Sequence, residues 1–145
     1  MNRLPYLFVV LLVVACGSPE KPQLTRSFVE PASGYSQAVV TSYNGQKTIH
    51  LSGQIGEGED LETQMRGALE KIEQLLKVHG ATFKDIVKMN HYIVDYQPED
   101  LEVFRNTRKE IMGDVNMPAS TLVGVTSLFS DQYLIEIDAV AIVVE

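Results

Sequence analysis

Two neighbouring segments in the first half of the chain have the residue pattern of β-strands. Residues 36–43 and 46–53 are rich in residues that favour extended backbone. Asn44-Gly45 lies between them, and this dipeptide is a strong signal for a two-residue hairpin turn. The sequence therefore predicts a β-hairpin from residue 36 to residue 53.

Hydrophobic residues then recur every three or four positions, which is the spacing of one helix face. This stripe consists of Leu61, Met65, Ala68, Leu69, Ile72, Leu75 and Leu76. Gly80 ends it, and Glu59 or Asp60 precedes it as the candidate N-cap. A second helix is predicted from Pro98, which suits a first helical turn, to Gly113, which suits the position after a helix end.

Three more segments have strand character, namely residues 85–96, 120–127 and 133–144. The predicted order is therefore β-β-α-β-α-β-β. This order favours a single α+β domain over residues 28–145, with both helices on one face of a mixed sheet. A chain of 145 residues has enough length to bury one hydrophobic core.

The last predicted strand has two unlike faces. Ile135, Ile137 and Ala139 share one face, which is wholly apolar and is predicted to be core. Glu136 and Asp138 share the other face. Two interpretations stay open for these acids: a solvent or interface face of the sheet, or a functional carboxylate.

The first residues of the chain differ from the rest. Arg3 precedes an apolar run over residues 4–14, and the segment ends in Val-Val-Ala followed by Cys16. Eleven helical residues span roughly 16 Å, too little for a hydrocarbon layer of about 30 Å. The ending resembles a bacterial lipoprotein box, so we predict a lipoprotein signal peptide over residues 1–15 and acylation of Cys16. The alternatives are a plain signal peptide, or a buried apolar N-terminus, with an incidental cysteine.

Residues 16–27 are polar after the cysteine and contain two prolines, which predicts a flexible tether. The expected location is therefore the bacterial cell envelope, on the periplasmic side and attached by lipid. Gly17 in place of an aspartate favours the outer membrane, by resemblance to lipoprotein sorting rules.

The net charge and the sequence motifs argue against several classes of partner and cofactor. The net charge of −7, with basic residues scattered singly, argues against nucleic acid as a partner. The three histidines, His50, His79 and His91, have no metal-ligand spacing, so no metal is predicted. Motifs for nucleotide cofactors are absent from the sequence, and we expect no cofactor.

Five segments, in order, resemble the RidA/YjgF family of enamine and imine deaminases. They are LSGQI (51–55), QMRGALEKIEQLLKVHG (64–80), DIVKMNHYIVD (85–95), MPAS (117–120) and IEIDAVA (135–141). The likeness extends from about Ser33 to Val143. It implies a chorismate-mutase-like α+β subunit, a homotrimer, and a small-molecule cleft between neighbouring subunits.

The resemblance also implies roles for individual residues. Family members hydrolyse reactive enamines and imines, such as 2-aminoacrylate, to a 2-keto acid and ammonia. Glu136 matches the catalytic glutamate that positions the attacking water, and Asp138 is expected to serve an interface or a supporting hydrogen bond. The remaining substrate-binding positions are Tyr35, Ser52, Gly53, Ser120 and Leu122.

One position departs from the family pattern. Ser120 stands where the family has an arginine that grips the substrate carboxylate through two charge-assisted hydrogen bonds, worth about 1.5–3 kcal/mol each. We therefore expect weak or absent activity on 2-aminoacrylate. A second hypothesis is that Arg105 or Arg66 reaches the cleft and substitutes.

Three functions remain in competition on the sequence. The first is a Rid-like hydrolase that acts on an imine or enamine metabolite. The second is a trimer that binds a small metabolite without turnover, and the third is a structural trimer tethered to the cell envelope.

Overall fold

The structure, a computed structural model, describes residues 21–144. The predicted hairpin is present in it as β2 (Tyr35–Tyr43) and β3 (Gln46–Gln54), which pair antiparallel. Asn44 and Gly45 form the turn with φ angles of 49° and 76°. Positive φ at both central residues is what a tight hairpin turn of this kind needs, and asparagine and glycine tolerate it best.

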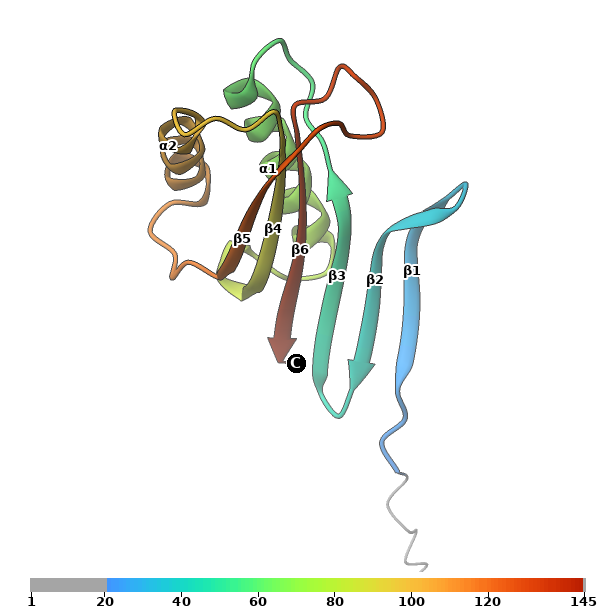
Figure 1. The fold of residues 1–145 in the computed structure, drawn as a ribbon. Coiled ribbons are helices and arrows are strands. Elements are labelled where there is room, and N and C mark those ends of the chain that lie inside the picture. The colour runs from blue at the N-terminus through green and yellow to red at the C-terminus, as the bar shows by residue number, and fades with distance from the viewer. Residues whose placement is uncertain (1–20, 145) are drawn as a thin grey trace, which may run out of the picture.

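The hairpin belongs to a six-stranded sheet with the order β1-β2-β3-β6-β4-β5. The other strands are β1 (Thr25–Ala32), β4 (Ile86–Val94), β5 (Ala119–Val125) and β6 (Ile135–Val144). Among the strands described in residues 21–144, only β4 and β5 pair in parallel, so the sheet is mixed. The helices α1 (Leu61–Val78) and α2 (Asp100–Met112) lie on one face of it (Figure 1), and a short 3-10 turn, Phe83–Asp85, precedes β4. The predicted α+β class is confirmed.

The predicted order of elements is wrong at its start, because β1 was not foreseen. The observed order is β-β-β-α-β-α-β-β. Seven of the eight residues of β1 are exposed, and it pairs only with β2 at the edge of the sheet. Its sequence mixes polar and apolar residues without a clear alternation and contains Pro31, which a sheet tolerates at an edge. The predicted tether, residues 16–27, therefore ends earlier than expected, since residues from Thr25 on are strand.

The two faces of β6 differ as the sequence predicts. Ile135, Ile137 and Ala139 are at most 1% exposed and lie in the core between the sheet and the helices. Glu136 and Asp138 lie on the opposite face, which the helices leave open. Because successive side chains of a strand point to opposite faces, burial of the apolar residues in the core places Glu136 and Asp138 on the open face.

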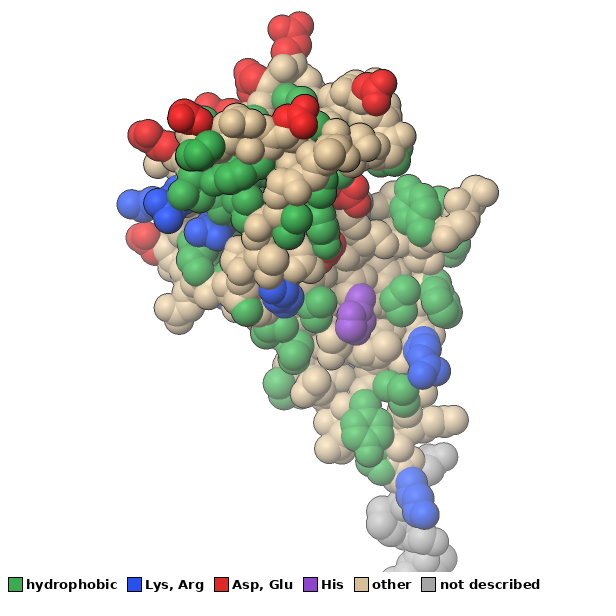
Figure 2. Space-filling view, viewed as in Figure 1, with side chains coloured by type: hydrophobic (Ala, Val, Ile, Leu, Met, Phe, Trp, Pro, Cys, Tyr) green, Lys and Arg blue, Asp and Glu red, His purple; other side chains and the backbone are tan. Residues whose placement is uncertain are grey.

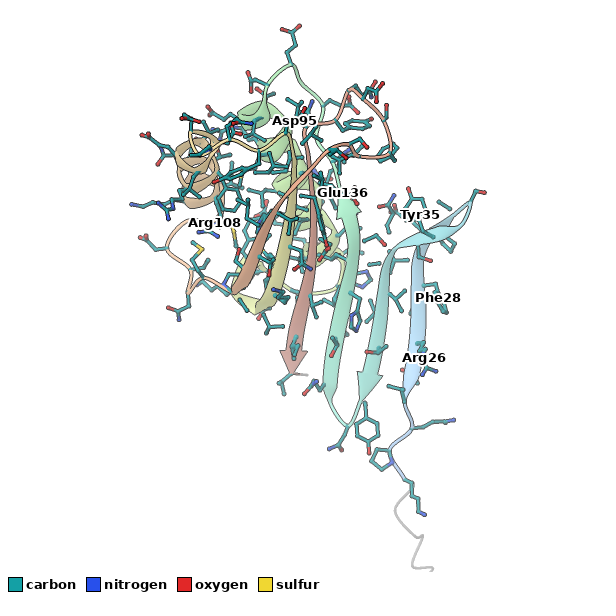
Figure 3. All side chains as sticks on the ribbon, viewed as in Figure 1. Arg26, Phe28, Tyr35, Asp95, Arg108 and Glu136 are labelled. Carbon is teal, nitrogen blue, oxygen red and sulfur yellow. The ribbon has the colours of Figure 1, made fainter. Side chains whose placement is uncertain are left out.

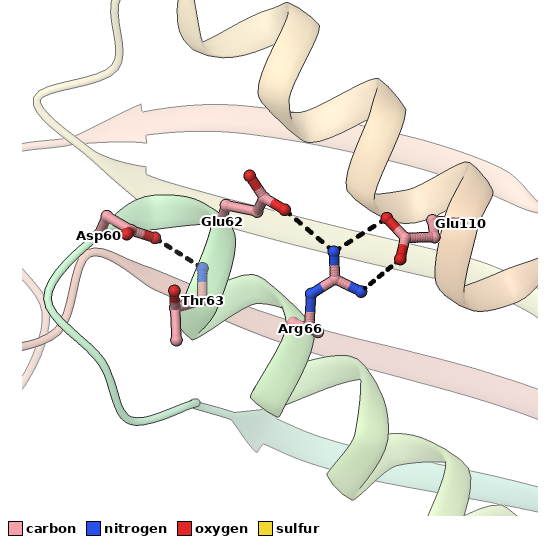
Figure 4. A network of polar contacts seen from close by, with 5 residues as sticks. All are labelled: Asp60, Glu62, Thr63, Arg66 and Glu110. Carbon is pink, nitrogen blue, oxygen red and sulfur yellow. Dashed lines mark hydrogen bonds and ion pairs between the residues drawn. The ribbon is translucent and has the colours of Figure 1, made fainter.

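Polar contacts hold α1 at its start and connect it to α2 (Figure 4). Asp60 is the N-cap, and its side chain accepts a hydrogen bond from the Thr63 backbone N–H at 2.8 Å. Arg66 on α1 donates two hydrogen bonds of 2.9 Å to Glu110 on α2 and one of 2.9 Å to Glu62. Because these pairs are exposed, they link the two helices but add little to the stability of the fold.

The predicted signal peptide and Cys16 fall outside the described residues. Within residues 21–144, no helix is long and apolar enough to span a membrane. Figure 2 shows acidic side chains gathered at one end of the molecule, and hydrophobic side chains spread over the rest of that face.

Candidate functional site

A cavity of about 590 Å³ opens where β2 begins, β3 ends and β6 begins. We call it the Glu136 cavity. Four of the predicted site residues line it together, although they come from three strands: Tyr35, Ser52, Gly53 and Glu136. Figure 3 shows Tyr35 and Glu136 on opposite sides of β3.

The Glu136 carboxylate occupies the space above Gly53. The pairing of β3 with β6 shifts register between Leu51 and Gln54, which places Gly53 under the Glu136 side chain. A Cβ atom at position 53 would lie 1.6 Å from Oε1 of Glu136. Only glycine leaves room for this close approach of carboxylate and backbone.

Glu136 is half-buried, and no donor within residues 21–144 reaches its carboxylate with a hydrogen bond. Burial, and then the nearby charge of Asp138, raise its pKa above the ordinary value for glutamate. Asp138 differs, since it accepts hydrogen bonds from Asn90 at 2.8 Å and from the Tyr92 hydroxyl at 3.3 Å. The two acids therefore have separate tasks: Asp138 is part of the polar structure of the sheet face, and Glu136 is free to bind a ligand or water.

Neighbouring hydrogen bonds hold the cavity wall. The Ser52 hydroxyl donates to the Ser36 carbonyl at 2.6 Å, so its lone pairs remain available to accept a bond from a ligand. Gln54 donates to the side chain of Gln37 and to the Ser52 carbonyl, both at 3.0 Å. These contacts fix the end of β3 against the start of β2, beside the Glu136 carboxylate.

Several lining residues were not foreseen from the sequence. Tyr133 donates to Glu57 at 3.1 Å, and Phe129 packs against Tyr133 with ring centroids 5.0 Å apart. Lys71 on α1 is the one lysine or arginine among the described residues that line the cavity. No local pattern marks these three, because a loop and a helix reach the cavity only after folding.

Ser120 and Leu122, which were also predicted to bind substrate, lie elsewhere in the subunit. On β5 they pair with Met89 and His91, on the face of the sheet that packs against the helices. Strand β4 separates β5 from β6. Within one chain these two residues therefore do not meet the Glu136 cavity.

An arginine on α2 contacts Ser120. Arg108 Nη1 donates to the Ser120 hydroxyl at 3.4 Å, and its guanidinium lies 4.9 Å from the centre of the Phe104 ring. Arg66, one of the two arginines considered as a substitute, is instead held by Glu62 and Glu110. The arginine beside Ser120 is therefore Arg108, and Arg66 is bound elsewhere.

The His91 side chain is buried, and its imidazole ring is uncharged at neutral pH. Its Nδ1–H donates to the Thr121 carbonyl at 3.1 Å, and its ring meets Phe104 edge-on with centroids 4.7 Å apart. Burial lowers the pKa of His91 to about 4. Within the described part of the chain, no three histidine, cysteine, aspartate or glutamate side chains cluster to hold a metal ion.

Comparisons with known proteins agree with this architecture. The sequence profile of the family described as Endoribonuclease L-PSP matches residues 25–143. A RutC family protein of Pyrococcus horikoshii is 32% identical over 122 residues, which are 81% of this chain and 93% of that protein.

Solved structures extend the likeness to three dimensions. A Mycobacterium tuberculosis member of the YjgF/YER057c/UK114 family is 31% identical, with a TM-score of 0.70 over 82% of this chain and 100% of that one. RidA from an Antarctic Psychrobacter is 25% identical, with a TM-score of 0.66 over 79% of this chain and 94% of that one. The chain therefore belongs to the RidA/YjgF family, also described as L-PSP, and has the fold of that family.

Proposed function

We propose that this protein hydrolyses a small imine or enamine to a carbonyl compound and ammonia in the Glu136 cavity. The observation that carries the proposal is the Glu136 carboxylate, which is half-buried, accepts no hydrogen bond within residues 21–144, and lies over Gly53. A carboxylate with a raised pKa is suited to accept and return a proton near neutral pH.

The reaction needs one base and one water. Glu136 takes a proton from the water as the water oxygen bonds to the imine carbon, the C=N π electrons move to nitrogen, and the protonated Glu136 then gives this proton to the nitrogen. The carbinolamine then collapses: Glu136 moves the hydroxyl proton to the amino group, the carbonyl forms as the C–N bond breaks, and ammonia leaves. An enamine first becomes an imine when the protonated form of Glu136 donates to its carbon.

Substitution of the base tests this function. The full-length protein is given imines generated in place by an amino-acid oxidase, and ammonia release is followed. We expect Glu136→Gln to lower the rate by about 10²- to 10⁴-fold while it leaves the fold intact. If the wild-type protein binds the 2-oxo acid product but does not accelerate hydrolysis, binding without turnover replaces the enzymatic function.

We propose further that the protein is a homotrimer. The open face of the sheet carries exposed aromatic side chains, among them Phe28 and Tyr43, and the helices cover only the other face. A second layer of protein on the open face would remove this apolar surface from water. Light scattering in detergent should give three times the chain mass for the protein component, and a monomer would contradict the proposal.

RNA cleavage, which the description of the family suggests, is not the function we propose. The net charge of −7 opposes binding to a polyanion, and electrostatic attraction supplies most of the affinity in such complexes.

A further inference from the structure

Two aromatic side chains form part of the wall of the Glu136 cavity. Phe129 and Tyr133 both line it, with ring centroids 5.0 Å apart and an angle of 39° between the ring planes. Tyr133 is 9% exposed, whereas Phe129 is 73% exposed. The Phe129 ring therefore leaves a large apolar surface in water beside the cavity, where a ligand can cover it.

The segment that carries this aromatic pair is fixed by a buried side chain of α1. Gln64 donates a hydrogen bond of 2.8 Å to the Gln132 carbonyl and accepts one of 2.7 Å from the Leu134 N–H. The Tyr133 N–H also donates to the Ser130 carbonyl at 3.2 Å, which closes a turn. A wall that is ordered before binding loses less entropy when the ligand arrives.

The Tyr133 hydroxyl is already in use. It donates to the Glu57 carboxylate at 3.1 Å, so the Tyr133 ring cannot turn away from the cavity without loss of that bond. The bond also uses the single proton of the hydroxyl. Phe129 and Tyr133 therefore offer a ligand chiefly the surface of their rings, and Ile55 adds an aliphatic side chain to the same cavity.

The cavity is also larger than a very small imine requires. Its volume of about 590 Å³ lies within the range of roughly 300–1,000 Å³ that is typical of pockets for drug-sized ligands. A water molecule takes up about 30 Å³ in the liquid, so an imine with only a methyl substituent would leave room for many waters beside the two rings. A larger apolar substituent would displace that water from the ring surfaces, which is favourable.

We propose that Phe129 and Tyr133 bind an aromatic substituent of the substrate, so that this protein acts on imines of aryl-substituted carbonyl compounds. This inference rests on the proposed function, because it assigns the substrate class of the same cavity. In this arrangement the C=N group lies towards Glu136 and the aryl ring towards Phe129. Contact between aromatic rings adds to the effect of burial alone, so an aryl group should bind better than a saturated ring of the same size.

Hydrolysis of two imines tests the substrate class. An amino-acid oxidase generates them from phenylalanine and from alanine, and the ratio of the two kcat/KM values is measured for the full-length protein. Because both imines carry the same carboxylate, the ratio reports the side chain. We expect the wild type to favour the phenylalanine-derived imine by about tenfold or more, and Phe129→Ala to lower the ratio by about tenfold. Phe129→Tyr should retain the preference.

Val78→Ala is the matched control. Val78 is an exposed apolar residue on α1 that does not line the cavity, so its loss should leave the ratio as in the wild type. A fall in the ratio of the same size in Phe129→Ala and in Val78→Ala would overturn the inference.

Binding of uncharged ketones, the class of product, tests the aromatic pair without turnover. Calorimetry with the full-length protein compares phenylacetone, cyclohexylacetone and acetone. We expect Kd to rise in that order, and Phe129→Ala to weaken the binding of phenylacetone by about tenfold. Phe129→Leu, which keeps an apolar side chain without a ring, should reduce the difference between phenylacetone and cyclohexylacetone.

Equal binding of phenylacetone by the wild type and by Phe129→Ala overturns the inference, and so does cyclohexylacetone that binds as tightly as phenylacetone. Hydrolysis of both imines at similar rates, dependent on Glu136 but not on Phe129, overturns the inference and leaves the proposed function standing. Binding of phenylacetone that depends on Phe129, with no hydrolysis of either imine, does the reverse.

Discussion

The carboxylate of Glu136 and the backbone of Gly53 occupy adjoining space so tightly that a single methyl group at position 53 would overlap Oε1. A register shift in the pairing of β3 with β6 produces this arrangement. It brings a carboxylate on one strand against the bare backbone of the neighbouring strand. The position of the proposed base therefore depends on a residue without a side chain.

Gly53→Ala should displace the Glu136 carboxylate. Because the overlapping atoms belong to the end of a flexible side chain, the side chain can rotate away, and we expect activity to fall by about 10²-fold or more with a small change in melting temperature. Imine hydrolysis and thermal unfolding are the measurements. The control is Gly124→Ala on β5, where the new Cβ would lie 3.1 Å from the Tyr96 Cβ and far from the cavity. Full activity in Gly53→Ala would show that the position of the Glu136 carboxylate does not depend on glycine at position 53.

Asp138→Asn should move the acidic limb of the rate profile to lower pH. The charge of Asp138 adds to burial in raising the pKa of Glu136, so removal of that charge lowers the pKa and keeps the base ionised in more acidic solution. The profile of kcat/KM against pH gives the shift directly. Asn90→Ala keeps the Asp138 charge and removes one of its hydrogen bonds, so it should not produce the same shift. A shift of the acidic limb to higher pH would contradict the assignment of Glu136 as the base.

His91 should make the protein sensitive to acid. Its pKa is about 4 in the folded chain, against about 6.5 when unfolded, so between these values the unfolded chain binds a proton that the folded chain does not. Stability is therefore complete above about pH 6.5 and falls towards pH 4, by an amount on the order of 3 kcal/mol from this residue.

Urea unfolding at pH 7 and at pH 4.5 measures that loss. In His91→Gln, which does not titrate, the difference between the two pH values should shrink. The same comparison in His50→Gln is the control, since His50 is exposed whereas His91 is buried. An unchanged difference in His91→Gln would assign the acid sensitivity to the carboxylates.

The mature N-terminus provides a test of the proposed envelope attachment. We expect a bacterial cell to remove residues 1–15 and to acylate Cys16, so that intact mass spectrometry shows the chain from Cys16 with added acyl groups. Cys16→Ser should leave the chain unacylated and release it from the membrane fraction. A mass that matches an unmodified N-terminus would reject the lipoprotein assignment.

Local sequence determined much of the fold. Asn44-Gly45 favours only a tight turn, Asp60 caps α1 because its carboxylate accepts a backbone N–H, and the alternation along β6 separates core from open face. Each of these depends on neighbours within a few residues, which is why pattern alone predicts them. The carboxylate at position 136 was likewise visible as an acid next to core residues.

The tertiary structure alone decided the rest. β1 is a strand because β2 offers it a partner, although its own residues are mostly exposed and show no clear strand pattern. The approach of Glu136 to Gly53 depends on the register of β6 against β3, and the contact of Arg108 with Ser120 depends on the packing of α2 beside β5. Such contacts leave no periodic trace in the sequence, because the geometry of the whole sheet and its helix layer fixes them.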